Sequence, residues 1–109
     1  MKEADVIRAL AALAQETRLR LFRLLVEAGP QGLTPGHMAD TLGASATALS
    51  FHLKELSHSG LVTSERDGRN IIYRAQIQSM NDLLGYLTTN CCQGQPCLTV
   101  PAVQCVECQ

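Results

Sequence analysis

The chain has 109 residues, 46 % of them hydrophobic and 17 % charged, which suits a single folded domain whose apolar surface a second copy would help to bury. No apolar run is long enough to span a membrane, and Asp5 and Arg8 interrupt the alanine- and leucine-rich start, so we expect a soluble, cytoplasmic protein without an export signal. The formal net charge of −1 does not indicate a nucleic-acid partner, so any such partner has to be inferred from motif and geometry.

The first part of the chain predicts two helices, over Glu3–Ala14 and Glu16–Ala28, because apolar residues recur there at helical spacing. In the second helix we expect the core-facing side to carry Leu19, Phe22, Leu25 and Val26. A glycine-proline pair ends that helix. A short third helix is predicted over residues 35–42, because Thr34 is a suitable N-cap and Gly43 can close the last turn.

A fourth helix is predicted to begin after Ser45, a second N-cap candidate. Leu49, Leu53 and Leu56 fall along one side of it as a core stripe. The outward face is expected to carry Ala46, Thr47, Ser50, Phe51 and Lys54. Two helices joined by a short connection around a glycine, the second with a polar outer face, are typical of a helix-turn-helix.

A β-hairpin is predicted next, because two β-prone runs, Leu61–Arg66 and Ile71–Ala75, flank an Asp-Gly turn. The hairpin carries Arg66, Arg69 and Arg74. A hairpin directly behind a helix-turn-helix is a wing, and its arginines can reach DNA phosphates or a minor groove.

A last helix is predicted from Ser79, as its N-cap, to about Asn90, with Asp82 in the first turn. Its apolar side consists of Met80, Leu83, Leu84 and Leu87. That side needs the first helix, a second copy of the chain, or both to cover it. The expected fold is therefore mainly α with a small β-hairpin, a homodimeric winged helix-turn-helix.

DNA contacts are expected from two exposed surfaces of this fold. The helix candidates for groove and phosphate contacts are Ser45, Thr47, Ser50, Phe51 and Lys54. The wing candidates are Arg66, Arg69 and Asn70. A two-fold dimer should read an inverted repeat with half-sites about one turn of DNA apart.

Two segments resemble the ArsR/SmtB family of metal-sensing repressors: Glu16-Thr17-Arg18-Leu19-Arg20-Leu21-Phe22, and Ser50-Phe51-His52-Leu53-Lys54-Glu55-Leu56 followed by Ser59-Gly60-Leu61-Val62. The resemblance covers roughly residues 1–90. It implies a winged-helix dimer that represses its operator and releases it on binding a metal or metalloid. It also implies that the first and last helices, Glu3–Ala14 and Ser79–Asn90, form the dimer interface.

The chain departs from many arsenic-sensing members of that family, which place a Cys-x-Cys pair on the first helix of the helix-turn-helix. Here that segment, Thr34–Asp40, contains no cysteine. The ending Asn90–Cys97 instead resembles a subset of the family whose arsenic-binding thiols follow the last helix.

All five cysteines lie in residues 91–109, and Cys91, Cys92 and Cys97 are the candidate ligands. Three thiolates converging from one side suit trivalent arsenic or antimony better than a tetrahedral ion that needs four ligands. Zinc is the main rival, because Cys105 and Cys108 could complete a four-thiolate site. A redox switch is a second rival, although the negative pole of the last helix disfavours the thiolate that oxidation requires.

These patterns predict a transcriptional repressor, with a DNA-binding and dimerisation domain in residues 1–90 and a cysteine-rich sensing segment in residues 91–109. It would leave its operator when arsenite, antimonite or methylarsenite binds the thiols. The choice between inorganic and methylated inducer, and between two and three thiolates, is open. A function of another class, a thiol metallochaperone or enzyme without a DNA role, is disfavoured because no residue is placed to assist a nucleophile. We therefore expect no enzymatic activity.

Overall fold

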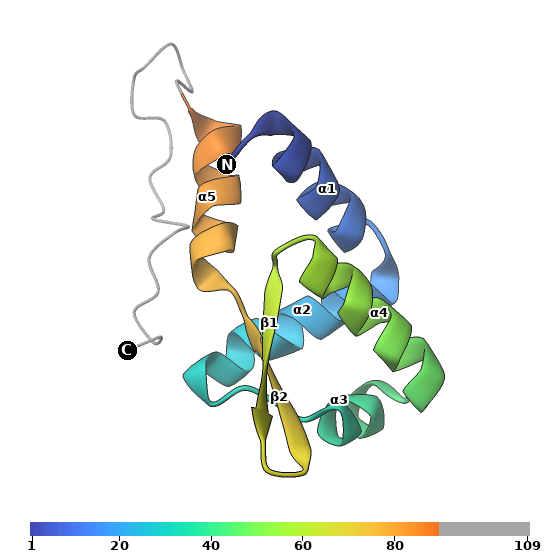
Figure 1. Cartoon of the computed structure of the whole chain (residues 1–109). Helices are drawn as coiled ribbons and strands as arrows, with labels where there is room; N and C mark the ends of the chain where they lie inside the picture. The colour runs from blue at the N-terminus through green and yellow to red at the C-terminus, as the bar shows by residue number, and fades with distance from the viewer. Residues whose placement is uncertain (90–109) are drawn as a thin grey trace.

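Five helices and a two-stranded antiparallel hairpin make up the part of the chain that the computed structural model describes, residues 1–89 (Figure 1). In chain order the elements are α1 (Glu3–Leu13), α2 (Glu16–Ala28), the 3₁₀ turn η1 (Gly29–Gln31), α3 (Pro35–Leu42), α4 (Ala46–His58), β1 (Val62–Asp67), β2 (Asn70–Ala75) and α5 (Ile77–Thr88). The mainly helical class and the hairpin were both predicted correctly.

The predicted helix starts in the helix-turn-helix are confirmed by side-chain caps. The Thr34 hydroxyl accepts a hydrogen bond from the His37 amide at 3.4 Å, and the Ser45 hydroxyl accepts one from the Ala48 amide at 3.2 Å. Gly43 closes α3 in the left-handed conformation, with φ 65°. The connection between α3 and α4 is therefore fixed by local chemistry.

The core lies where α1, α2, α3 and α4 meet the root of the hairpin. Its fully buried large side chains are Leu21, Leu25, Met38, Leu49, Leu53, Leu56 and Leu61. The predicted stripe on α4 is confirmed, but the prediction for Leu19 is wrong, because that side chain is 47 % exposed. Leu19 lies six positions, or about 120°, around the helix from Leu25. Leu21 takes the expected place in the core.

The hairpin pairs Val62 with Ala75 at its root and Asp67 with Asn70 at its tip. Only Gly68 and Arg69 form the turn, and Gly68 has the positive φ of 64° that such a short turn needs. An isolated bridge joins Leu33 to Tyr73, with N–H···O distances of 2.9 and 2.8 Å, and it attaches the hairpin to the segment before α3.

Helix α5 begins at Ile77, so the predicted N-cap, Ser79, is wrong. The Gln76 amide donates to the Leu61 carbonyl at 2.8 Å, and the Gln76 carbonyl accepts from Met80 at 3.2 Å. Helical bonding therefore starts immediately after the strand and needs no side-chain cap. Asp82 consequently lies beyond the first turn, where its carboxylate accepts a hydrogen bond from Gln78 at 2.8 Å.

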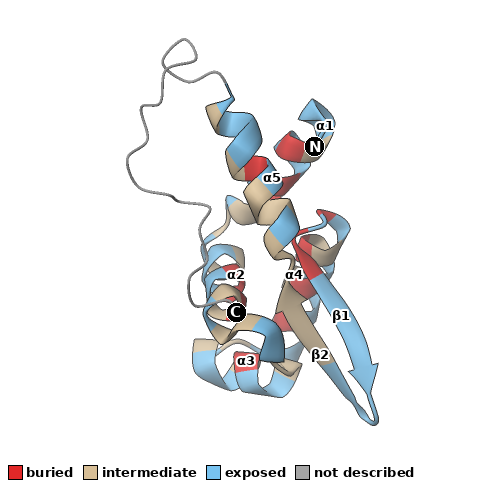
Figure 2. Cartoon of the chain, turned by 90° about the vertical axis from the view of Figure 1, so that its left-hand side faces the viewer, coloured by how far each residue is buried: buried red, intermediate tan, exposed pale blue. Residues whose placement is uncertain are grey.

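The two ends of the molecule differ in character. Helices α1 and α5 lie at one end, whereas α3, the start of α4 and the tip of the hairpin lie at the other (Figures 1 and 2). Residues 63–71 of the hairpin are all exposed, so its tip projects beyond the packed helices. No helix within residues 1–89 is long and apolar enough to cross a membrane.

Candidate nucleic-acid interface

The outward face of α4 and its N-cap carry all the helix residues that we predicted to contact DNA. Ser45, Thr47, Ser50, Phe51 and Lys54 are all exposed. The Phe51 side chain is 54 % exposed, an unusual position for a large aromatic group. Hydroxyls, an ammonium group and an aromatic ring on one exposed helix face match the groups that contact base edges, phosphates and thymine methyls. Contact with DNA remains a prediction for each of these residues.

His52, which the sequence placed near the core stripe of α4, packs against the protein. Its ring packs edge-on against Phe51, with ring centroids 5.6 Å apart. Its Nδ1 atom is buried and finds no hydrogen-bond partner among the described residues. These contacts favour a packing role for His52 over a phosphate contact.

The hairpin formed by β1 and β2, which we call the wing, presents the three predicted wing residues at or near its tip. Arg66, Arg69 and Asn70 are all exposed, and Arg69 is the second residue of the two-residue turn. Neither Arg66 nor Arg69 takes part in an ion pair with any residue that the structure describes. Both guanidinium groups are therefore available to phosphates.

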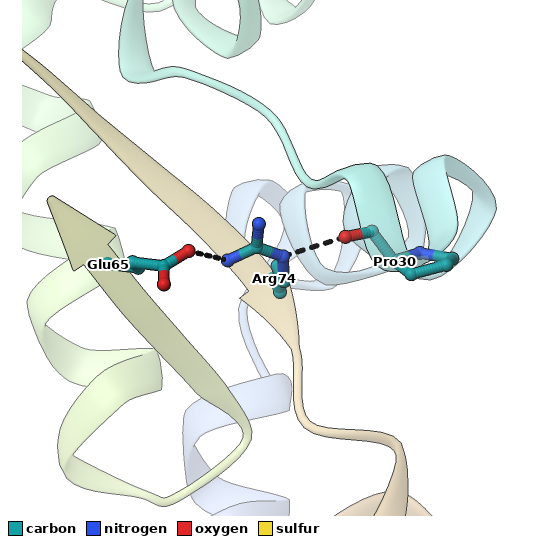
Figure 3. A network of polar contacts seen from close by, with 3 residues as sticks. All are labelled: Pro30, Glu65 and Arg74. Atoms are coloured by element: carbon teal, nitrogen blue, oxygen red, sulfur yellow. Dashed lines mark hydrogen bonds and ion pairs between the residues drawn. The ribbon is translucent and has the colours of Figure 1, made fainter. Parts of the chain in front are cut away.

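Arg74, which the sequence grouped with the other wing arginines, has a different environment. Its Nε donates to the Pro30 carbonyl at 2.7 Å, and its Nη1 donates to the Glu65 carboxylate at 2.9 Å (Figure 3). The prediction that Arg74 reaches DNA is therefore not supported, because its guanidinium already joins two parts of the protein.

The five cysteines, including the candidate ligands Cys91, Cys92 and Cys97 and the pair Cys105 and Cys108, lie outside the described residues. Within residues 1–89, no three His, Cys, Asp or Glu side chains gather in a way that could hold a metal ion.

The arrangement of α3, α4 and the wing defines a winged helix-turn-helix DNA-binding domain. Residues 13–65 match the family model described as a helix-turn-helix domain. A solved ArsR-like transcriptional regulator from Rhodococcus sp. RHA1 is 33 % identical, with a TM-score of 0.69 over 77 % of this chain and 76 % of that one. The chain therefore belongs to the ArsR family of winged-helix transcriptional regulators.

Two other solved relatives bear on function. A protein described as a possible transcriptional regulator for arsenical resistance is 37 % identical, with a TM-score of 0.64 over 72 % of this chain and 79 % of that one. A homodimeric winged helix-turn-helix domain from Mycobacterium bovis is 26 % identical, with a TM-score of 0.61 over 78 % of this chain and 83 % of that one. Because its relatives are transcriptional regulators, the chain is a regulator and not an enzyme.

Replacing Arg69 by alanine should weaken operator binding and flatten its dependence on salt. A lost phosphate contact reduces the slope of log K against log[salt] by about 1 and weakens binding similarly for all sequences. Fluorescence anisotropy at several salt concentrations measures both quantities. Arg20→Ala on α2, which removes another exposed arginine, one paired with Glu16, is the control. An unchanged slope for Arg69→Ala would exclude it as a phosphate contact.

Proposed function

We propose that this ArsR-family regulator is a repressor that binds an inverted-repeat operator as a homodimer and releases it when trivalent arsenic binds its cysteines. Cys91, Cys92 and Cys97 are the proposed ligands for arsenite, antimonite or methylarsenite. The observation that carries the proposal is the position of these thiols, which begin three residues after the end of α5. As a regulator that binds DNA, the protein would act in the cytoplasm.

The proposed dimer is supported by the exposed apolar side chains at the α1–α5 end. Ile7 and Leu10 on α1 are 60 % and 41 % exposed, and Tyr86 and Leu87 on α5 are 43 % and 53 % exposed. Apolar groups gathered at one end favour an interface with a second copy. The homodimeric relative with the same fold supports the same assembly.

The proposed inducer follows from ligand chemistry. Arsenous acid exchanges its hydroxyl groups for thiols, so that each As–S bond formed releases one water molecule. Three soft sulfur ligands, without a histidine between them, favour trivalent arsenic over harder ions. The solved relative described as a possible transcriptional regulator for arsenical resistance adds support.

The proposed coupling uses α5. The hydroxyls of Thr88 and Thr89 donate to carbonyls in the last turn of α5, and Leu83, one turn earlier, is buried in the core. Binding of Cys91 and Cys92 to one arsenic atom would constrain the backbone at the end of α5. Since α5 also belongs to the proposed dimer interface, arsenic binding would change the angle between the two DNA-binding domains. Coupling of the usual size, about 1–3 kcal/mol, lowers operator affinity roughly 5- to 150-fold.

The test is an anisotropy titration of the protein on a labelled inverted-repeat operator, to which arsenite, methylarsenite, zinc and peroxide are added separately. We expect the two arsenicals to release the DNA, at concentrations where zinc and peroxide do not. Release by zinc alone would indicate a four-thiolate site that includes Cys105 and Cys108. Release by peroxide alone would indicate a redox switch. Either result would refute the proposed inducer but not the proposal that the protein binds an inverted-repeat operator.

A further inference from the structure

We infer that Arg74 is a positioning residue that holds the wing at the angle required for DNA binding, without touching DNA itself. The inference rests on DNA binding by the helix-turn-helix and the wing, and it does not depend on the inducer. Three contacts at the root of the wing support it: the hydrogen bond to Pro30, the ion pair with Glu65 and the bridge between Leu33 and Tyr73.

Arg74 connects the two strands of the hairpin to each other and to a segment 44 residues away in sequence (Figure 3). It lies on β2, its carboxylate partner Glu65 lies on β1, and its carbonyl partner Pro30 lies in η1, just after α2. A planar guanidinium group can donate in two directions at once with little loss of rotational freedom, which a lysine ammonium cannot reproduce. One side chain therefore fixes the hairpin relative to the helix that precedes the helix-turn-helix.

The ion pair also crosses the hairpin. In the register of the two strands, Arg74 lies opposite Thr63 and Glu65 lies opposite Ile72. Arg74 and Glu65 are therefore diagonal neighbours on one face of the hairpin. An isolated two-stranded hairpin is marginally stable, and residues 63–71 of this one are exposed. Contacts at its root must therefore set the direction in which the exposed tip points.

The charges at the root make a direct phosphate contact by Arg74 unfavourable. Its guanidinium is already compensated by Glu65 at 2.9 Å, whereas Arg66 and Arg69 carry no such partner among the described residues. The wing thus separates two tasks: arginines at its tip are free for DNA, and the arginine at its root orders the hairpin.

The decisive variant is Glu65→Gln, because a positioning role and simple electrostatics predict opposite signs. Removing a negative charge from a DNA-facing hairpin should strengthen binding to a polyanion. If Glu65 instead orders the wing through Arg74, operator affinity should fall by roughly two- to fivefold, the range expected for an exposed ion pair. The slope of log K against log[salt] should stay unchanged, since no phosphate contact is lost.

Glu27→Gln is the matched control. It breaks the Arg23–Glu27 pair on α2, whose nitrogen–oxygen distance is 3.2 Å, and it leaves the wing untouched. The Glu27 side chain is 63 % exposed and that of Glu65 is 64 % exposed, so the two glutamates are matched. We expect it to leave affinity unchanged or slightly raised. Arg74→Gln should weaken binding at constant salt slope, and Arg74→Lys should recover only part of that loss. Circular dichroism should show the same helix content in every variant.

The inference is overturned if Glu65→Gln binds the operator as tightly as Glu27→Gln or more tightly. It is also overturned if Arg74→Gln flattens the salt dependence as Arg69→Ala does, because Arg74 would then be a phosphate contact. A wild-type protein that fails to bind any inverted repeat would instead refute the proposed operator, a result that is distinguishable from either of these.

Discussion

Replacing Cys91 or Cys92 by serine should leave operator binding intact and abolish release by arsenite. A serine hydroxyl is a hard, weakly acidic donor that does not replace a thiolate on a soft ion. The variants should therefore lose the whole proposed coupling, a change of about 5- to 150-fold in operator affinity on adding arsenite. Anisotropy titrations with and without arsenite measure this ratio, and the affinity without arsenite should equal that of the wild type.

The remaining cysteines provide graded controls for that experiment. Cys105→Ser and Cys108→Ser should respond to arsenite as the wild type does. Cys97→Ser should lose the response to inorganic arsenite but keep the response to methylarsenite, which needs only two thiolates. If release by arsenite persists in a variant lacking both Cys91 and Cys92, the sensing site lies elsewhere in the chain.

Replacing Gly32 by alanine should destabilise the domain more than any other single glycine substitution in residues 1–89. A Cβ atom at this position would lie 2.6 Å from the Tyr73 carbonyl oxygen and 2.6 Å from the Ile72 side chain. The backbone at Gly32 and strand β2 cannot move apart without breaking the bridge between Leu33 and Tyr73. We expect a loss of about 1–3 kcal/mol from this clash, in addition to about 1–3 kcal/mol from a backbone conformation that favours glycine.

Gly29→Ala separates those two contributions. Gly29 has φ 73° and ψ −154°, close to the φ 69° and ψ −176° of Gly32, but a Cβ atom there would meet nothing within 4 Å. It should therefore lose only the backbone contribution. Urea unfolding followed by circular dichroism gives both free energies. Equal losses in the two variants would show that the hairpin is not packed against residue 32.

The sequence predicted most of the fold because its signals are local. Serine and threonine caps, a left-handed glycine and a regular leucine stripe each act within one or two helical turns, and α3 and α4 begin where these signals place them. The start of α5 was missed because a backbone hydrogen bond from Gln76 to Leu61, just beyond the paired strands, precedes that helix, and the hydroxyl of Ser79 does not cap it.

The exposed residues of the candidate site were predictable from the sequence, whereas contacts between distant segments were not. Exposure of the α4 face follows from helical periodicity, and exposure of Arg66 and Arg69 follows from their places at the end of β1 and in the turn of the hairpin. The different environment of Arg74 was not predictable, because its partner Pro30 lies 44 residues away and no pattern along the chain links the two. Gly32 is a similar case, since the groups that exclude a side chain there come from β2. The misplaced Leu19 reflects an apolar stripe on α2 that is centred on Phe22 and Leu25.

The affinity of the protein for arsenite, measured by equilibrium dialysis with and without saturating operator, tests whether metalloid and DNA binding oppose each other. Linkage requires the operator to weaken arsenite binding by the same factor by which arsenite weakens operator binding. We predict a decrease of roughly 5- to 150-fold in the presence of the operator. Equal arsenite affinities for the free and the DNA-bound protein would contradict a regulator whose thiols control its hold on DNA.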